Sequence, residues 1–279
     1  MEPNGQVRPA TRPIDLHCHS TFSDGVLDPA ALARRAAAQG VTALALTDHD
    51  TVDGVGPASD AAAPLGLRLI PGIEISTWHT REIHVLGYFV DPAHARLRAV
   101  TARQRIARVE RVREIAGRLA ALGIPLDVDA VLAQAGPGNV GRPHIATALL
   151  EGGHVRDRDD AFDRLLGAGK PAYVPASRLP ASDAIALIHE AGGVAVLAHP
   201  GVENIDHALP DLARAGLDGL ECAHPAHDAA TTQRYRRLAQ RNGLAPTGGS
   251  DFHHPYGAYD LGSFGLDADE LATLEARRR

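Results

Sequence analysis

Two histidines near the start of the chain, His17 and His19, constrain its structure more than any other feature. They lie in the segment 14–25, which has the pattern of a strand and the loop that leaves it. Side chains two residues apart on a strand point to the same face, so both imidazoles can bind one metal ion. Asp24 follows on the loop, where Gly25 permits a tight turn. Alone, the pair is as typical of a surface strand as of a metal site.

Further residues of metal-binding type stand at the ends of four apolar runs, 43–49, 67–74, 194–199 and 244–253. Runs of this length between glycines or prolines predict buried strands. A fifth run, 82–88, carries a histidine inside it. Barrel enzymes build their sites at the carboxyl ends of successive parallel strands. The pattern therefore predicts a multinuclear metal centre, whose ligands would be His17, His19, Asp24, His49, Glu74, His84, His199, Asp251 and His253.

Strand and helix patterns alternate in the first third of the chain, which favours a mostly parallel sheet that is closed or nearly closed. Between residues 95 and 180 this alternation stops, and only helical patterns occur, at 95–122, 127–134, 142–150 and 160–166. The sequence therefore predicts an α/β fold in three parts. Residues 1–94 and 181–279 form the barrel, and residues 95–180 form a helical insertion over the catalytic face, which serves as a substrate lid.

Charge and composition narrow the choice of partners. The chain has 279 residues, with 28 Lys and Arg against 34 Asp and Glu, and a net charge of −6. That balance argues against a duplex nucleic-acid partner, which normally needs a basic stripe. It is compatible with a phosphorylated substrate, because divalent ions supply local positive charge. The polar opening 1–13 and the lack of a run of ~20 apolar residues predict a cytoplasmic enzyme with no membrane partner.

Several short motifs carry a resemblance to a known family. They are His17-x-His19, Ser23-Asp24-Gly25, Thr47-Asp48-His49-Asp50, Gly72-Ile73-Glu74, His84, Ala198-His199-Pro200 and Gly249-Ser250-Asp251-Phe252-His253. Together they resemble the motifs of the polymerase and histidinol phosphatase (PHP) phosphoesterase family over nearly the whole chain. The resemblance implies a distorted (β/α)7 barrel with three divalent metal ions.

The same resemblance assigns ligands to each ion. The first would be held by His17, His19, Glu74 and Asp251. Glu74 would bridge to a second ion, bound by His84 and His199. The third would be held by Asp24, His49 and His253. Imidazole and carboxylate ligands suit Mn, Fe or Zn better than Mg or Ca, and manganese is the first expectation.

One subgroup of the family resembles this chain in length and in having a helical insertion. It includes 3′,5′-nucleoside bisphosphate phosphatases and a relative that trims short RNA from its 5′ end. The segment 138–144 resembles the substrate-contacting region of that subgroup, which makes Arg142 and His144 the expected substrate contacts. Arg142 stands beside a helix N-terminus, a favourable place for a phosphate. His227, at the catalytic end of the barrel, is expected to contact substrate and, with Asp251, to act in catalysis.

The expected substrate is therefore a small phosphorylated nucleotide. The expected reaction removes the 3′-phosphate of a 3′,5′-nucleoside bisphosphate and leaves a 5′-mononucleotide. One alternative is a 5′-to-3′ exonuclease on short oligoribonucleotides, which would use the same centre. Another is an accessory module like the PHP domains attached to some DNA polymerases. Because aromatic residues are only 4% of the chain, and the insertion offers only Phe162 and Tyr173 for base stacking, a mononucleotide is expected to be preferred to RNA. The oligomeric state stays open.

Overall fold

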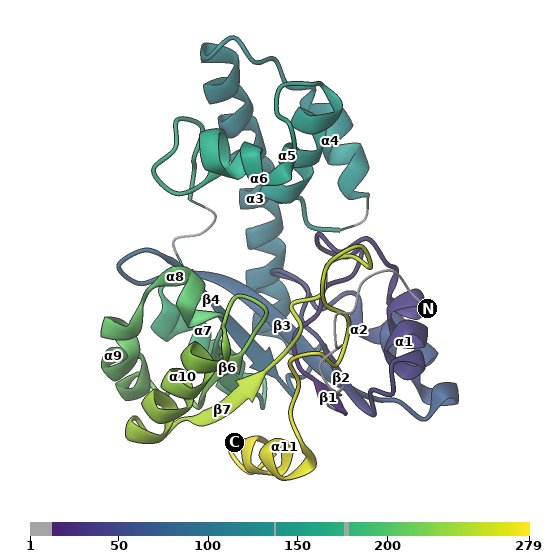
Figure 1. The fold of residues 1–279 in the computed structure, drawn as a ribbon, viewed down its shortest axis with the longest axis vertical. Coiled ribbons are helices and arrows are strands. Elements are labelled where there is room, and N and C mark those ends of the chain that lie inside the picture. The colour runs from purple at the N-terminus through teal and green to yellow at the C-terminus, as the bar shows by residue number, and fades with distance from the viewer. Residues whose placement is uncertain (1–12, 137, 176–178) are drawn as a thin grey trace.

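A single sheet of seven strands bends into a nearly closed barrel (Figure 1). The computed structural model describes residues 13–136, 138–175 and 179–279, so most of the polar opening lies outside the described residues. The strands are paired in chain order, and a parallel bridge joins Cys18, after the first strand, to Phe252, after the last. The α/β barrel agrees with the prediction. Its strands are β1 (Ile14–Asp15), β2 (Ala43–Leu46), β3 (Arg68–Trp78), β4 (Glu82–Tyr88), β5 (Val194–Leu197), β6 (Gly219–Ala223) and β7 (Ala245–Gly248).

One strand departs from the predicted parallel order. β4 is antiparallel to both of its neighbours, β3 and β5, whereas the other pairs of neighbouring strands are parallel. The reason is the connection before it, since only residues 79–81 separate β3 from β4. A parallel pair needs a crossover of a dozen or more residues, so a connection this short forces a hairpin.

Helices cover the outside of the barrel. Several begin where an aspartate caps the first turn: the carboxylate of Asp28 accepts the Ala31 N–H at 2.7 Å, and that of Asp228 accepts the Thr231 N–H at 2.7 Å. The helices are α1 (Pro29–Ala38), α2 (Val55–Ala62), the short 3-10 helix η1 (Ala63–Leu65), α7 (Ala181–Glu190), α8 (Pro200–Glu203), the 3-10 helix η3 (Asp206–Ala208), α9 (Leu209–Arg214), α10 (Ala229–Arg241) and α11 (Ala268–Glu275).

The described part of residues 95–180, hereafter the insertion, is mainly helical and has an apolar core of its own. Buried residues of this core include Val112, Ile115, Leu119, Ile145 and Leu149. The predicted helix at 160–166 is divided into a short α-helix followed by a π-helical turn. The insertion contains α3 (Ala95–Ala121), α4 (Val128–Ala135), α5 (Arg142–Glu151), α6 (Arg158–Ala161) and the π-helix η2 (Phe162–Leu166).

The long helix α3 connects the two parts of the molecule. Its 27 residues span about 40 Å, and Figure 1 shows it rising from beside the sheet into the upper lobe. Near its start, Leu97 is buried in a core cluster of the barrel. Further along, Gln104 donates to the Ser76 carbonyl at 3.2 Å, and Arg108 pairs with Asp50 at 2.6 Å. These polar contacts fix the stem of the insertion against the barrel.

Both cysteines are free and buried, as expected for cysteines that pack in the hydrophobic core. Burial raises the pKa of the Cys222 thiol to about 12, so it is a thiol at neutral pH and is not poised as a nucleophile. Among the described residues, no helix combines the length and apolarity that a membrane span requires.

Candidate metal centre

The predicted ligands converge at the end of the barrel that faces the insertion. His17 and His19 lie just beyond the short strand β1, in an extended segment that is held in place by its neighbours. The His19 N–H donates to the Phe252 carbonyl at 2.9 Å, and the Cys18 carbonyl accepts the Thr47 N–H on the other side of the segment at 3.0 Å. Both rings therefore point to one face, as the spacing of two residues predicted.

The first predicted ligand set is the most compact. The Nε2 atom of His17 lies 3.4 Å from Glu74 Oε2 and 3.3 Å from Asp251 Oδ1. The Nε2 atom of His19 lies 3.3 Å and 3.2 Å from the same two oxygens. Ligand atoms around a tetrahedral ion with bonds of about 2.1 Å are roughly 3.4 Å apart. The separations therefore match the edges of a metal site.

Unsatisfied buried atoms support the same conclusion. Within the described part of the chain, no hydrogen-bond partner is found for His17 Nε2, His19 Nε2 or Glu74 Oε2, although these atoms are inaccessible to solvent. A buried polar atom without a partner is costly, and a native fold retains one where something else binds it. The donor set of imidazoles and carboxylates fits a divalent ion.

The second predicted set gathers around the other oxygen of Glu74. Its Oε1 atom lies 2.8 Å from His84 Nδ1 and 3.0 Å from His199 Nε2. His199 has a φ of 25°, which a residue with a side chain adopts only when its surroundings enforce it. One carboxylate thus faces ligand-type atoms of both sets, which is the geometry that a bridging ligand requires.

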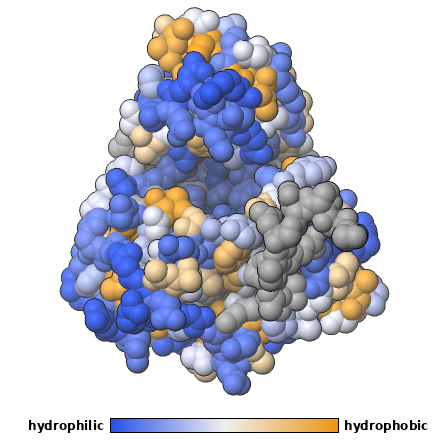
Figure 2. Space-filling view, viewed as in Figure 1, coloured by the Kyte–Doolittle hydropathy of each residue, from blue (hydrophilic) through white to orange (hydrophobic). Residues whose placement is uncertain are grey.

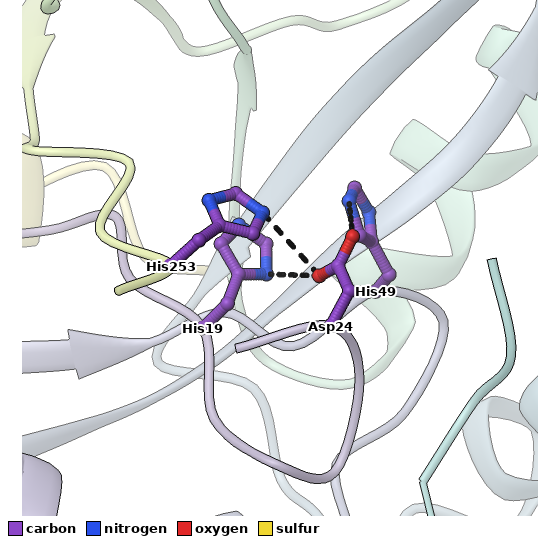
Figure 3. Close-up of side chains that lie close together, drawn as sticks. All are labelled: His19, Asp24, His49 and His253. Carbon is purple, nitrogen blue, oxygen red and sulfur yellow. Dashed lines mark ion pairs between the residues drawn. The ribbon is translucent and has the colours of Figure 1, made fainter. Parts of the chain in front are cut away.

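The third predicted set lies around Asp24 (Figure 3). His253 Nε2 lies 3.3 Å from Asp24 Oδ1, and His49 Nε2 lies 3.7 Å from Asp24 Oδ2. His19 also faces this carboxylate, with its Nδ1 atom at 3.8 Å. His49 has a second neighbour, because its Nδ1 atom lies 3.0 Å from Glu74 Oε2. The ring of His49 therefore stands between the third set and the bridging carboxylate.

The carboxylates of the cluster are ionised. Burial alone would raise the pKa of Glu74, but His49, His84 and His17 around it hold that pKa well below its usual range. Asp251 is held low in the same way by His17 and His253. Burial and the neighbouring His253 lower the pKa of His19 to about 4, so its ring is neutral at pH 7. The cluster thus presents anionic oxygens and at least one neutral imidazole.

Two buried side chains that the sequence analysis did not assign orient the first set. The His17 Nδ1–H donates to Glu221 Oε1 at 2.9 Å, which leaves Nε2 available as an acceptor. The other oxygen of Glu221 accepts the His199 N–H at 2.7 Å. Glu221 is the middle residue of β6 and is followed by Cys222 and Ala223, so the strand-end rule does not indicate it.

A similar relay fixes the ring of His19. The Ser23 hydroxyl donates to Asp48 Oδ1 at 2.6 Å, and the His19 Nδ1–H donates to the same hydroxyl oxygen at 3.3 Å. Partners of this kind hold a ligating histidine in one tautomer and one orientation. Asp48 belongs to a recognised motif, yet it supports a ligand instead of joining the ligand cluster.

The two histidines after β6 have different surroundings. His224 is 5% exposed and lies 3.2 Å through Nε2 from Asp251 Oδ2. Its Nδ1 atom accepts the Ala226 N–H at 3.0 Å. His227 donates through Nδ1 to the Cys222 carbonyl at 2.9 Å and accepts the Gly201 N–H at Nε2 at 3.1 Å. Both ring nitrogens of His227 are thus occupied by backbone. Its substrate and catalytic roles stay predictions that this geometry does not favour, and His224 is the nearer histidine.

The insertion brings arginines to the edge of the cluster. Arg142 begins α5 and lies 3.4 Å from Glu82, with its guanidinium over the rings of Phe162 and Tyr173. Arg111 lies 3.6 Å from the same carboxylate. Although burial raises the pKa of Glu82, these arginines bring it down to about 2. His144 lies one turn into α5, where its Nδ1 accepts the Gly141 N–H at 3.1 Å.

A cleft of about 720 Å³ opens over the cluster, and a side lobe of about 100 Å³ extends from it under the insertion. Figure 2 shows a recess between the upper lobe and the barrel, with many hydrophilic residues around it. Asp24, His49 and His84 line both the cleft and the side lobe. Arginine side chains line the lobe, hereafter the arginine lobe: Arg108, Arg111 and Arg142. Glu82 and Asp24 line the same lobe. The arrangement can bind a phosphate ester in the cleft beside a pocket that offers guanidinium groups.

Comparisons with known proteins agree with this chemistry. A model of the PHP domain matches residues 15–122. The 5′-3′ exoribonuclease of Haemophilus influenzae is 42% identical over 258 residues, which cover 90% of this chain and 94% of that protein. The 3′,5′-nucleoside bisphosphate phosphatase of Chromobacterium violaceum is 38% identical and covers 89% of this chain and 90% of its own length.

A solved structure from Bifidobacterium adolescentis, assigned as a metal-dependent phosphoesterase, superposes with a TM-score of 0.88 at 33% identity. The match covers 97% of this chain and 98% of that one. The insertion is therefore included in the similarity, together with the barrel. With the clustered histidines and carboxylates, these matches lead to one conclusion: the chain belongs to the PHP family and is a metal-dependent hydrolase of phosphoester bonds.

Proposed function

We propose that this enzyme removes the 3′-phosphate of a 3′,5′-nucleoside bisphosphate and releases a 5′-mononucleotide and phosphate. The observation that carries the proposal is the arginine lobe, which adjoins the ligand cluster and shares Asp24, His49 and His84 with the cleft. A substrate with two phosphates fits a site with one place for the scissile phosphate and another for the phosphate that stays. The relative from Chromobacterium violaceum carries the name of this activity.

The residues that would hold the metal ions are the nine predicted ligands, with Glu74 as the bridge. When bound, divalent ions of this kind activate water for attack and neutralise the charge of the phosphate. Manganese is the proposed ion, because the donor set mixes imidazole with carboxylate. Glu221 and Ser23 keep the rings of His17 and His19 in the tautomer that presents Nε2 to the cluster.

The insertion would recognise the phosphate that is not cleaved. The guanidinium of Arg142 lines the arginine lobe at the first turn of α5, where backbone N–H groups also favour an anion. Arg111 adds a second positive charge to the same space. Phe162 lines both the cleft and the lobe, so its ring is available to pack against the nucleoside between the two phosphates. His144 remains a proposed contact.

A second candidate function is 5′-to-3′ exonuclease action on short oligoribonucleotides. The observation that favours it is the size of the cleft, whose volume of about 720 Å³ is far larger than that of the arginine lobe. The relative from Haemophilus influenzae carries the name of that activity. The two activities break the same bond, between phosphorus and the 3′-oxygen of the first nucleotide.

Steady-state kinetics with three substrates test the proposal. Adenosine 3′,5′-bisphosphate, histidinol phosphate and a 5′-phosphorylated dinucleotide would be compared with manganese-loaded protein. We expect the bisphosphate to have the highest kcat/KM and histidinol phosphate the lowest. If the dinucleotide is hydrolysed with the higher kcat/KM, the exonuclease is the main activity. Failure to hydrolyse any of them would refute both candidates.

A further inference from the structure

The loop after β7 brings aromatic side chains to the mouth of the cleft. His254 and Tyr259 line the cleft together with Gly257 and Ala258, and none of these residues lines the arginine lobe. The sequence analysis considered only the insertion as a source of stacking rings. One of its two aromatics, Tyr173, is already engaged, because its hydroxyl donates to Glu82 at 2.9 Å and Arg142 lies over its ring.

Tyr259 has the properties of a stacking platform. Its ring packs against Phe264 in a T-shaped contact, with centroids 4.8 Å apart and an interplanar angle of 82°. The residue nonetheless stays 45% exposed. A ring that is held by a neighbour on one side and open on another loses little conformational freedom when a base packs on it. Base stacking on such rings is a sequence-tolerant source of affinity.

The aromatic loop and the arginine lobe lie beside different ligands of the cluster. His253, a predicted ligand, is followed directly by His254, so the aromatic loop lies beside the His253 part of the cluster. The arginine lobe lies beside His49 and His84. A substrate held at the lobe by its 5′-phosphate and at the cluster by its 3′-linked phosphate would continue toward the aromatic loop.

We propose that Tyr259, in the part of the chain that lines the cleft together with His254, forms a second nucleoside subsite, which binds the base of the nucleotide that follows the scissile phosphate. This inference rests on the proposed function, because it takes the 5′-phosphate of the first nucleotide to occupy the arginine lobe. Water attacks phosphorus, the bond from phosphorus to the 3′-oxygen breaks, and that oxygen leaves with a proton on the first nucleotide. The phosphate stays on the 5′-oxygen of the second nucleoside.

Arg158 supports an anionic substrate at the same mouth. It begins α6 on the insertion side of the cleft, which it lines together with Asp159 and Phe162. A guanidinium at this place favours the phosphodiester that follows the second nucleoside, which only substrates of three or more nucleotides carry.

The test is a ratio of two kinetic constants measured on the full-length protein loaded with manganese. The ratio is kcat/KM for a 5′-phosphorylated diadenosine dinucleotide divided by kcat/KM for adenosine 3′,5′-bisphosphate. In Tyr259→Ala we expect this ratio to fall roughly 5- to 150-fold, the value of one stacked base. Tyr259→Phe keeps the ring and should restore the ratio. Trp78→Ala, which removes a partly exposed aromatic outside the cleft lining, is the control.

Each outcome of this experiment either supports or overturns the second nucleoside subsite. A selective fall in the ratio for Tyr259→Ala, absent in Tyr259→Phe and in Trp78→Ala, supports the subsite. An unchanged ratio overturns it, as does an equal loss for both substrates, which would indicate a structural role for the loop. Wild-type protein that hydrolyses the bisphosphate but not the dinucleotide also overturns it. Wild-type protein that hydrolyses neither substrate refutes the proposed function itself, which separates the two failures.

Discussion

Removal of the Arg108 guanidinium should destabilise the protein more than other substitutions on α3. Arg108 donates through Nε to Asp50 Oδ2 at 2.8 Å and through Nη2 to Ser76 Oγ at 3.0 Å. The two charged side chains are 7% and 2% exposed. In Arg108→Met the carboxylate of Asp50 stays buried without its counter-charge, while the methionine fills part of the volume. Breaking a buried pair from one side costs about 3–5 kcal/mol.

The expected loss is large enough to measure by heat or urea. For a chain of this size each kcal/mol shifts Tm by roughly 2–4 °C, so Arg108→Met should lower Tm by roughly 6–20 °C. Arg105→Met, an exposed arginine on the same helix, is the matched control and should stay within about 0.5 kcal/mol of wild type. Circular dichroism at neutral pH would follow both transitions.

The double variant separates charge from packing. Asp50→Asn in the Arg108→Met background removes the uncompensated charge, so it should recover part of the lost stability. Asp50 also accepts the Ser76 N–H at 2.8 Å, and an asparagine oxygen can still do so. Two results would refute the argument that the unpaired Asp50 carboxylate causes the loss of stability. One is a fall of less than about 1 kcal/mol in the free energy of unfolding of Arg108→Met. The other is a double variant that is less stable than Arg108→Met.

The other predictions concern the site. Glu74→Gln should lose metal and activity together, because Glu74 faces two ligand sets, and elemental analysis that finds full occupancy would contradict this. Arg142→Ala should lower kcat/KM for the bisphosphate roughly 30- to 150-fold, about 2–3 kcal/mol, with metal content intact; an unchanged value would remove it from the site. Glu221→Gln should weaken metal affinity roughly 10- to 100-fold, measured by competition with a chelator, and wild-type affinity would exclude a positioning role.

The ligand cluster was predictable from sequence because strand ends obey a simple rule. His17 and His19 face one way because they are two apart, and His199 follows the apolar run of β5. Glu74 ends the apolar run that the sequence shows, but β3 continues past it to Trp78. The reversed strand β4 was not predicted, although the three residues between it and β3 indicate a hairpin.

Residues that act through distant partners were beyond the reach of sequence patterns. Glu221 meets His17 across 204 positions, and Arg108 meets Asp50 across 58, so no local spacing indicates either pair. His227 was placed at the correct end of the barrel, but a position does not tell which groups its ring nitrogens bind. The stacking argument failed to look beyond the insertion, and it missed Tyr259, which packs on Phe264 in the last part of the chain.

The continuity of α3 determines where related proteins can exchange their insertions. A chimera joined at Ala95 would exchange Gln104 and Arg108 as well, and the recipient barrel would lose its contacts to Ser76 and Asp50. A junction just after Arg108, in mid-helix, keeps the recipient's stem and transplants only the upper lobe. The donor must still supply an amide at the place of Asn139, which binds the carbonyls of His49 and Asp50. The unit that can be exchanged between barrels of this fold thus begins inside a helix and not at a loop.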